Sequence, residues 1–203
     1  KWLWMAEGDK DYAGLLDKMM QMKAALSVPV IAKETGCGIA AEQYRLLLDA
    51  GFRHFDCAGA GGTNFPAIEA ARQGIALSEE FASWGVPTCW SLIDAQAVLP
   101  QDAVLLGSGG VQHAADAVRV LVLGADAVGI TGVVLRLVVE QGVDAAVEFF
   151  QQLEEELRCY LLLLGAQTTK QLRKVPLVVT GETKDFVACR GYELAQLCRA
   201  RRA

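Results

Sequence analysis

The feature that most constrains the fold of this chain is a pair of apolar runs that each end in glycine and lead into a helical pattern. In the segment AVLLGSGGVQHAADAVRVLVLGADAVGITG, residues 103–132, the first run exits through Gly107, Gly109 and Gly110, and the second through Gly132. Short, continuous apolar runs are typical of strands buried on both faces of a parallel sheet. The pattern therefore predicts two parallel strands, each followed by a tight turn and a helix.

The same alternation of strand and helix extends over most of the chain. Apolar runs predict strands at 28–33, 53–58, 103–107 and 126–130. Helical patterns lie at 12–26, 41–50, 66–72, 87–99, 113–123, 133–141 and 143–164. Such alternation indicates βαβ units around a parallel sheet with helices on its outside. Right-handed crossovers then bring the carboxyl ends of the strands to one edge, where such sheets bind ligands.

The pattern changes after Gly165, where a short helix, an extended piece and a turn are expected over 168–186, followed by a helix at 193–199. No linker or repeat divides the chain, so residues 1–203 are expected to form a single domain. A closed (β/α)8 barrel of the TIM type has eight strands in about 250 residues. With four strands, the chain is expected to supply the last four strand–helix units of such an α/β barrel, together with C-terminal helices.

Composition excludes several classes of protein. A net charge of −5 argues against a nucleic-acid partner, because binding to a phosphate backbone needs clustered basic side chains. The basic cluster in this sequence is Arg199, Arg201 and Arg202, at the end of the chain. The apolar runs are too short to span a bilayer, and no secretory signal opens the chain. Six cysteines without a CxxC pair and two histidines offer no metal ligand set. We therefore expect a cytoplasmic protein with reduced thiols and with neither a membrane nor a nucleic-acid partner.

The glycine turns are candidates for a phosphate site. Glycine lets the backbone approach a ligand closely, and the helix that follows adds its positive end. In (β/α)8 enzymes, the turns after the last two strands often share one phosphate. The alternative is a pair of tight turns without a ligand, and Gln112 stands where a dinucleotide fingerprint would have its third glycine. The candidate N–H donors are those of Gly109, Gly110, Val111, Thr131 and Gly132.

Two further features at strand exits are candidates for chemistry. Lys33 closes the apolar run VIAKE, and a lysine at the carboxyl end of a barrel strand points into the site, where it can stabilise developing negative charge. Its alternative role is a pairing with Glu34 or with another buried carboxylate. The segment CAGAGGTNFPAIE offers a hydroxyl, an aromatic ring and a carboxylate in Thr63, Phe65 and Glu69. Taken alone, this segment could equally be an ordinary loop and helix start.

Six segments carry a family resemblance: PVIAKETGCG, GAGGTNFPAIE, WGVPT, SGGVQHAADAVRVLVLGADAVGITG, LGAQTTKQLRKVPLVVTGET and RGYEL. In this order they resemble the type 2, FMN-dependent isopentenyl-diphosphate isomerases. MAEGDKDYAG, near the start, resembles the segment before that family's lysine strand. The resemblance covers nearly the whole chain, and its most specific features are the spacing from Lys33 to Thr63 and the paired glycine turns.

The resemblance implies a role for each residue singled out above. Lys33 matches a lysine beside the N1/O2 edge of the flavin, where it favours the anionic reduced form, and Thr63 matches a threonine that contacts the flavin. Phe65 stands where an aromatic side chain lies near the substrate. Glu69 matches a carboxylate on the same side, so the expected catalytic residues are Lys33 and Glu69. Ala58 stands where the family has serine or glycine. The backbone groups expected to hold the FMN phosphate are those of Gly109, Gly110, Val111, Thr131 and Gly132.

The resemblance also implies a reaction, the interconversion of isopentenyl diphosphate and dimethylallyl diphosphate by a homo-oligomer with reduced FMN in an acid–base role. NADPH would only reduce the flavin, because the net reaction has no redox change, and Mg²⁺ would bind the diphosphate. The family's basic clamp on the diphosphate and its Gln-Glu pair, whose glutamate holds Mg²⁺, have no counterpart in this sequence. This chain alone is therefore expected to be inactive.

Two other functions fit parts of the sequence. A 2-hydroxy-acid oxidase is also an FMN barrel, but it needs an active-site histidine after the lysine strand and an arginine for the substrate carboxylate, whereas His54 lies within a predicted strand. A half-barrel could instead bind phosphate or FMN, pair its open strand edges with a second copy and catalyse nothing.

Overall fold

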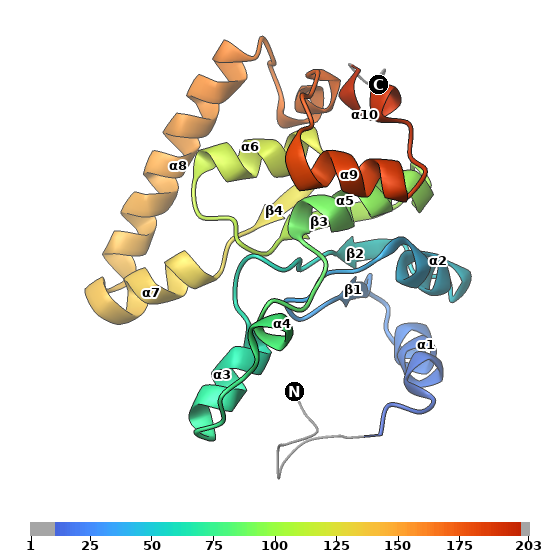
Figure 1. Ribbon diagram of the computed structural model, residues 1–203. Helices are drawn as coiled ribbons and strands as arrows, with labels where there is room; N and C mark the ends of the chain where they lie inside the picture. The colour runs from blue at the N-terminus through green and yellow to red at the C-terminus, as the bar shows by residue number, and fades with distance from the viewer. Residues whose placement is uncertain (1–10, 200–203) are drawn as a thin grey trace.

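Four parallel strands form the centre of the structure, a computed structural model that describes residues 11–199 (Figure 1). The strands are β1 (Ile31–Lys33), β2 (His54–Asp56), β3 (Val104–Ser108) and β4 (Ala127–Gly129), and they pair in the order β1-β2-β3-β4. All four predicted strands and their parallel pairing are confirmed. Neighbouring strands run the same way because each connection carries at least one helix that returns the chain to the same end of the sheet.

Helices connect and flank these strands, and each of the seven helical patterns before residue 165 forms a helix within three residues of its predicted ends. Two regions lie outside the described range. One is residues 1–10, which include part of the segment MAEGDKDYAG, and the other contains the basic residues Arg201 and Arg202. The helices are α1 (Leu15–Ala25), α2 (Ala41–Asp49), α3 (Phe65–Arg72), α4 (Glu79–Ala82), α5 (Thr88–Val98), α6 (Ala114–Val122), α7 (Gly132–Gln141), α8 (Val143–Leu163), the 3-10 helix η1 (Thr169–Lys174), α9 (Gly181–Cys189) and α10 (Leu194–Cys198).

The C-terminal part differs from expectation at α9. The turn predicted around Gly181 is wrong, because a nine-residue helix begins there. Tertiary packing stabilises this helix: the ring of Phe186 stacks on Trp90 of α5, with centroids 4.6 Å apart, and Val187 is fully buried. The single-turn helix α4 was also not expected. It is capped by Ser78, the residue before it, whose Oγ accepts the Phe81 N–H at 3.2 Å. The short helix expected after residue 168 and the helix expected at 193–199 are confirmed by η1 and α10.

The two faces of the sheet have different environments. Ala32, Phe55 and Leu105 point to one face and are buried among side chains of the surrounding helices, such as Tyr44 and Leu92. Because side chains alternate along a strand, the residues between them point to the other face. That inner face is only partly covered within the described residues, and Ile31 of β1 is 47% exposed on it. One covered and one open face are consistent with a four-stranded part of an α/β barrel.

Gly107 is required by the covered face. A Cβ atom at this position would lie 2.2 Å from Cγ1 of Val120, so a larger residue would push α6 away from β3. This glycine therefore permits close packing of helix on strand and has no contact with the edge where ligands bind. Its role differs from that of the glycines that follow it.

The buried carboxylate of Asp94 forms hydrogen bonds that link α5 to α2 and to the end of α9 on the covered side of the sheet. Asp94 of α5 is 1% exposed. Its Oδ2 accepts the N–H of Ala41 at the start of α2 at 2.9 Å, and its Oδ1 accepts the Tyr192 hydroxyl at 2.6 Å. Arg190, at the end of α9, donates to the same carboxylate and also pairs with the exposed Glu42. Charge-assisted hydrogen bonds of this kind are about twice as strong as neutral ones.

The first prediction concerns this network. Replacing Asp94 with alanine should lower the free energy of unfolding by about 3 kcal/mol, because it leaves buried donors without an acceptor. Replacing Glu42, the exposed partner of the same arginine, should leave stability nearly unchanged. Urea denaturation of the two variants measures the difference, and equal stabilities would contradict the assigned role.

Candidate functional site

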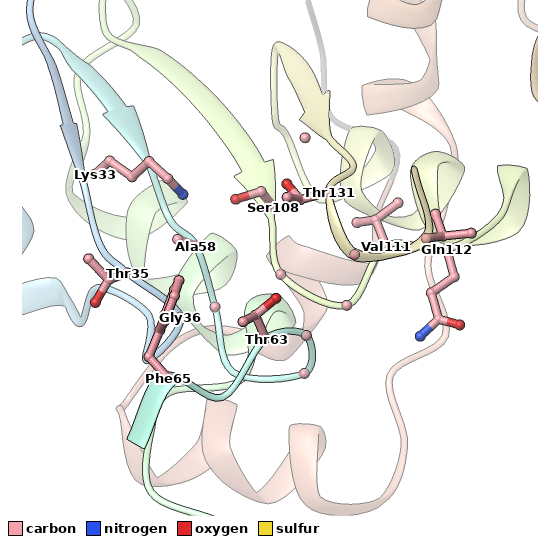
Figure 2. A pocket seen from close by; sticks show the side chains of 18 of the residues that line it. Lys33, Thr35, Gly36, Ala58, Thr63, Phe65, Ser108, Val111, Gln112 and Thr131 are labelled. Carbon is pink, nitrogen blue, oxygen red and sulfur yellow. The ribbon is translucent and has the colours of Figure 1, made fainter. Parts of the chain in front are cut away.

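A pocket of about 530 Å³ lies at the carboxyl edge of the sheet, where the loops after all four strands meet (Figure 2). Eight of the nine residues predicted for the site line it: Lys33, Thr63, Phe65, Gly109, Gly110, Val111, Thr131 and Gly132. The lining also includes residues that the sequence did not predict for the site: Thr35, Ser108, Gln112 and Arg136, together with Ile68 on α3.

Glu69 is the predicted site residue that does not line the pocket. It lies on α3, and its Oε1 accepts a hydrogen bond from Arg72 Nη1 at 2.9 Å, one turn further along the same helix. The residues of α3 that line the pocket are Phe65 and Ile68, three positions apart and therefore on one side of the helix. This side of the pocket is apolar.

Lys33 enters the pocket and also has a buried partner. Its Nζ lies 3.1 Å from Oδ2 of Asp56, the residue directly opposite it on β2. Lys33 therefore does both things that the sequence suggested: it lines the pocket, and it pairs with a buried carboxylate. The other suggested partner, Glu34, instead accepts the backbone N–H groups of Gly36, at 2.7 Å, and Cys37. The signal for Asp56 in the sequence was a single acidic residue inside the apolar run RHFDCA.

The structure shows why positions 109 and 110 are glycine, which the sequence alone did not reveal. Both adopt positive φ, and a Cβ atom on Gly109 would lie 2.1 Å from the carbonyl oxygen of Gly59, while one on Gly110 would lie 2.5 Å from that of Gly61. The turn after β3 therefore packs backbone to backbone against the loop after β2. These glycines are needed for loop–loop contact, whether or not a ligand also approaches them.

Gly132 is different, because nothing lies within 4 Å of a Cβ atom built on it. It is the first residue of α7 and lines the pocket, so the space beside it is open toward the cavity. Within residues 11–199, the N–H groups of Gly110, Val111, Thr131 and Gly132 donate to no backbone carbonyl. Free N–H groups at the start of a helix, beside open space, fit an anionic group such as a phosphate.

The charges of the lining favour the same kind of ligand. Its charged side chains are Lys33 on the β1 side and Arg136 on α7, and no aspartate or glutamate belongs to it. The positive end of the α7 dipole adds to this field. The pocket thus suits a ligand with an anionic group on the α7 side, since the charge of Lys33 on the other side is partly balanced by Asp56.

Two groups in segments next to the pocket, one of them in the buried core, are held in defined protonation states. Burial raises the pKa of the Cys57 thiol, which donates to the Ser108 carbonyl at 3.5 Å, so this cysteine stays neutral and is a poor nucleophile. Burial alone would raise the pKa of Asp116, but its hydrogen bond from the Gln112 N–H and the adjacent His113 lower it. Asp116 is therefore ionised near neutral pH and holds the start of α6 against the turn.

Within the described part of the chain, no three histidine, cysteine, aspartate or glutamate side chains gather closely enough to hold a metal ion. No helix of this part is long and apolar enough to cross a membrane.

The fold is that of an α/β-barrel protein with a pocket at the carboxyl edge of its strands. The chain belongs to the FMN-dependent dehydrogenase family, whose model matches residues 17–178. Among its relatives are proteins named isopentenyl-diphosphate delta-isomerase: the chain is 41% identical over 189 residues to that of Geobacillus sp. strain WCH70 and 37% identical over 196 residues to that of Methanopyrus kandleri. These matches cover 93% and 95% of this chain but 54% and 53% of the relatives. The family resemblance seen in the sequence is confirmed, and the chain spans about half the length of the curated relatives it matches.

Solved structures support the barrel fold. Mandelate oxidase with benzoyl-formic acid matches with a TM-score of 0.60 and 23% identity, over 78% of this chain and 41% of that one. A mutant of mandelate oxidase with the monooxide FMN adduct gives the same TM-score at 22% identity, over 78% and 44% of the two chains. At this identity the likeness concerns the fold alone, which confirms the predicted TIM-barrel class. His54 begins β2, at the opposite end of that strand from the pocket edge.

Proposed function

We propose that the protein to which this chain belongs is a type 2 isopentenyl-diphosphate delta-isomerase, which interconverts isopentenyl diphosphate and dimethylallyl diphosphate with reduced FMN. The observation that carries this proposal is the pocket in which Lys33 and the paired turns at Gly110 and Gly132 lie together, in a chain whose relatives bear that enzyme name. The conversion is a 1,3-proton shift, for which bound reduced FMN would supply the acid–base group.

The residues of the pocket fit FMN. The open space beside Gly132 and the free N–H groups of Gly110, Val111 and Thr131 would take the phosphate. The flavin ring would then extend toward Lys33, whose ammonium would stabilise negative charge on the N1/O2 edge. Thr63 also lines the pocket, on the loop after β2, and would contact the flavin (Figure 2).

The hydrocarbon part of the substrate would lie against α3. Phe65 and Ile68 present apolar surface to the pocket, and both are more than 40% exposed, so a bound isoprenoid chain would remove them from water. Glu69 would join the reaction only after its carboxylate leaves Arg72, with which it pairs here. Its proposed catalytic role therefore includes a side-chain rotation.

The remaining parts of the proposal concern partners. NADPH would serve only to reduce the flavin, and Mg²⁺ would bind the diphosphate. The lining has no carboxylate, so the residues of this pocket do not fit Mg²⁺ and no step is assigned to the metal here. We further propose a cytoplasmic homo-oligomer.

A half-barrel that binds FMN or phosphate without catalysis is the second candidate. It is favoured by the open inner face and by the outer edge of β1, which pairs with no other strand among the described residues. Unpaired strand edges invite association with a second copy.

The test separates the two candidates. The intact protein is purified, its flavin absorbance is recorded, and isopentenyl diphosphate is added with pre-reduced FMN and Mg²⁺. Formation of dimethylallyl diphosphate supports the isomerase. Flavin binding without product supports the non-catalytic half-barrel, and the absence of flavin binding contradicts both proposals for FMN.

A further inference from the structure

Asp56 is a buried carboxylate on the inner face of the sheet, in contact with two residues that line the pocket. The residue is 8% exposed and lies at the end of β2, between Lys33 on β1 and Ser108 on β3. In Figure 2 the ammonium of Lys33 and the hydroxyl of Ser108 point toward each other from either side of β2. Asp56 contacts both.

The strand register explains how these three residues meet. Lys33 is the direct partner of Asp56, and Asp56 is the partner of Leu106. Ser108 lies two residues beyond Leu106 and therefore points to the same face of the sheet. On the next strand, the partner of Ser108 is Gly129, which has no side chain to cover the row. The side chains of Lys33 and Ser108 thus reach the pocket without a side chain at position 129 covering them.

The two oxygens of Asp56 have different partners. Oδ1 accepts the Ser108 hydroxyl at 2.6 Å and the Ala58 N–H at 3.2 Å. Oδ2 lies 3.1 Å from the Lys33 ammonium. Because two donors on Oδ1 orient the carboxylate without help from the lysine, Oδ2 is a fixed acceptor for a mobile side chain.

We propose that Asp56 is a positioning residue, which together with Ser108 holds the Lys33 ammonium where it contacts the flavin edge. The proposal rests on the proposed FMN-dependent function. A lysine has a flexible four-carbon stem, and the Lys33 side chain is 53% exposed, so without a partner it would sample many positions. Electrostatic stabilisation is effective when the charge is held in place before the reaction.

The isosteric variant Asp56→Asn tests this arrangement sharply. Since the Ala58 N–H needs an acceptor, the amide oxygen of the asparagine takes the place of Oδ1, and its NH₂ group faces the ammonium. The NH₂ group and the ammonium are then both hydrogen-bond donors, so they repel each other and Lys33 leaves its position. If Lys33 leaves the flavin, the anionic reduced form is less stabilised and the flavin midpoint potential falls. If Asp56 contributes only its negative charge, removing that charge raises the potential.

The sign of the shift therefore separates positioning from a simple charge effect. In the flavin-loaded intact protein, Asp56→Asn is expected to reduce the preference for reduced over oxidised FMN by roughly tenfold, and Ser108→Ala should shift it the same way by less. In a Lys33→Ala background, Asp56→Asn should no longer lower it, because its partner is absent. Asp94→Asn, in the buried network on the other side of the sheet, is the matched control and should change stability without changing the potential.

A second measurement needs no flavin. An amine-reactive probe, quantified at Lys33 by peptide mass spectrometry, should modify this residue several-fold faster in flavin-free Asp56→Asn than in the unmodified protein. A raised or unchanged potential with FMN bound, or an unchanged labelling rate, overturns the proposal. A protein that binds no FMN contradicts the proposed function instead, and the labelling rate then decides by itself whether Asp56 holds Lys33. Ser108→Ala keeps both measurements decisive if Asp56→Asn does not fold.

Discussion

Replacing Lys33 with alanine in the intact protein is expected to lower the turnover of isopentenyl diphosphate by about 10²–10³-fold, the usual loss when one preorganised electrostatic group is removed. The variant should also bind FMN more weakly. Lys33 and Arg136 are the two cationic side chains in the pocket lining. Lys33 is on β1 and Arg136 is on α7, so Arg136 cannot take over the place of Lys33. Steady-state kinetics with pre-reduced FMN measure the loss.

The variant Lys33→Arg should restore little of this activity. A guanidinium is longer and planar, and it prefers to pair with both oxygens of a carboxylate. Opposite Asp56, it would bind the carboxylate and turn away from the flavin edge. Lys170→Ala, at an exposed lysine in η1, is the matched control and should behave as the unmodified protein. Near-normal turnover in Lys33→Ala would rule out the electrostatic role.

The 203-residue chain by itself is expected to form no measurable dimethylallyl diphosphate, with turnover at least about 10³-fold below that of an intact enzyme. Its inner sheet face is open, and the basic clamp and the metal-binding glutamate implied by the resemblance have no counterpart in it. Losing one charged partner of a ligand costs about 2–5 kcal/mol, and several are absent together. The assay combines this chain with pre-reduced FMN, Mg²⁺ and isopentenyl diphosphate.

The same chain should self-associate if it folds. Ile31 is exposed on the open face of β1, and the outer edge of this strand is unpaired in the described range, so a two-fold dimer that extends the sheet is the simplest arrangement. Light scattering measures the mass. A monodisperse monomer that forms product would contradict both expectations. FMN could still bind, because both turns proposed for its phosphate lie within the chain.

Much of the fold could be predicted because it depends on short-range patterns. Apolar runs marked the four strands, and helical periodicity marked α2, α5, α6 and α8 to within a residue or two. The parallel arrangement follows from strand–helix alternation, and it brings the residues at the strand exits to one edge. For this reason Lys33, Thr63 and the two glycine turns line one pocket, although up to 99 positions separate Lys33 from Gly132 in the sequence.

Other features depend on contacts between distant segments, which no local pattern encodes. The helix α9 exists where a turn was expected, because Phe186 packs on Trp90, 96 positions earlier. The partner of Lys33 is Asp56 rather than the adjacent Glu34, because strand register brings Asp56 opposite Lys33.

Thus the sequence by itself determined the strands, most helices and the edge that carries the site, because each depends on residues a few positions apart. Only the tertiary structure decided what each side chain meets there. It showed that Gly109 and Gly110 are required by the loop after β2, that Gly132 faces open space, and that Glu69 turns to Arg72. The contacts of Gly109 and Gly110 depend on the approach of segments about 50 residues apart, which the packing of the whole sheet determines, whereas Glu69 and Arg72 lie three positions apart on one helix.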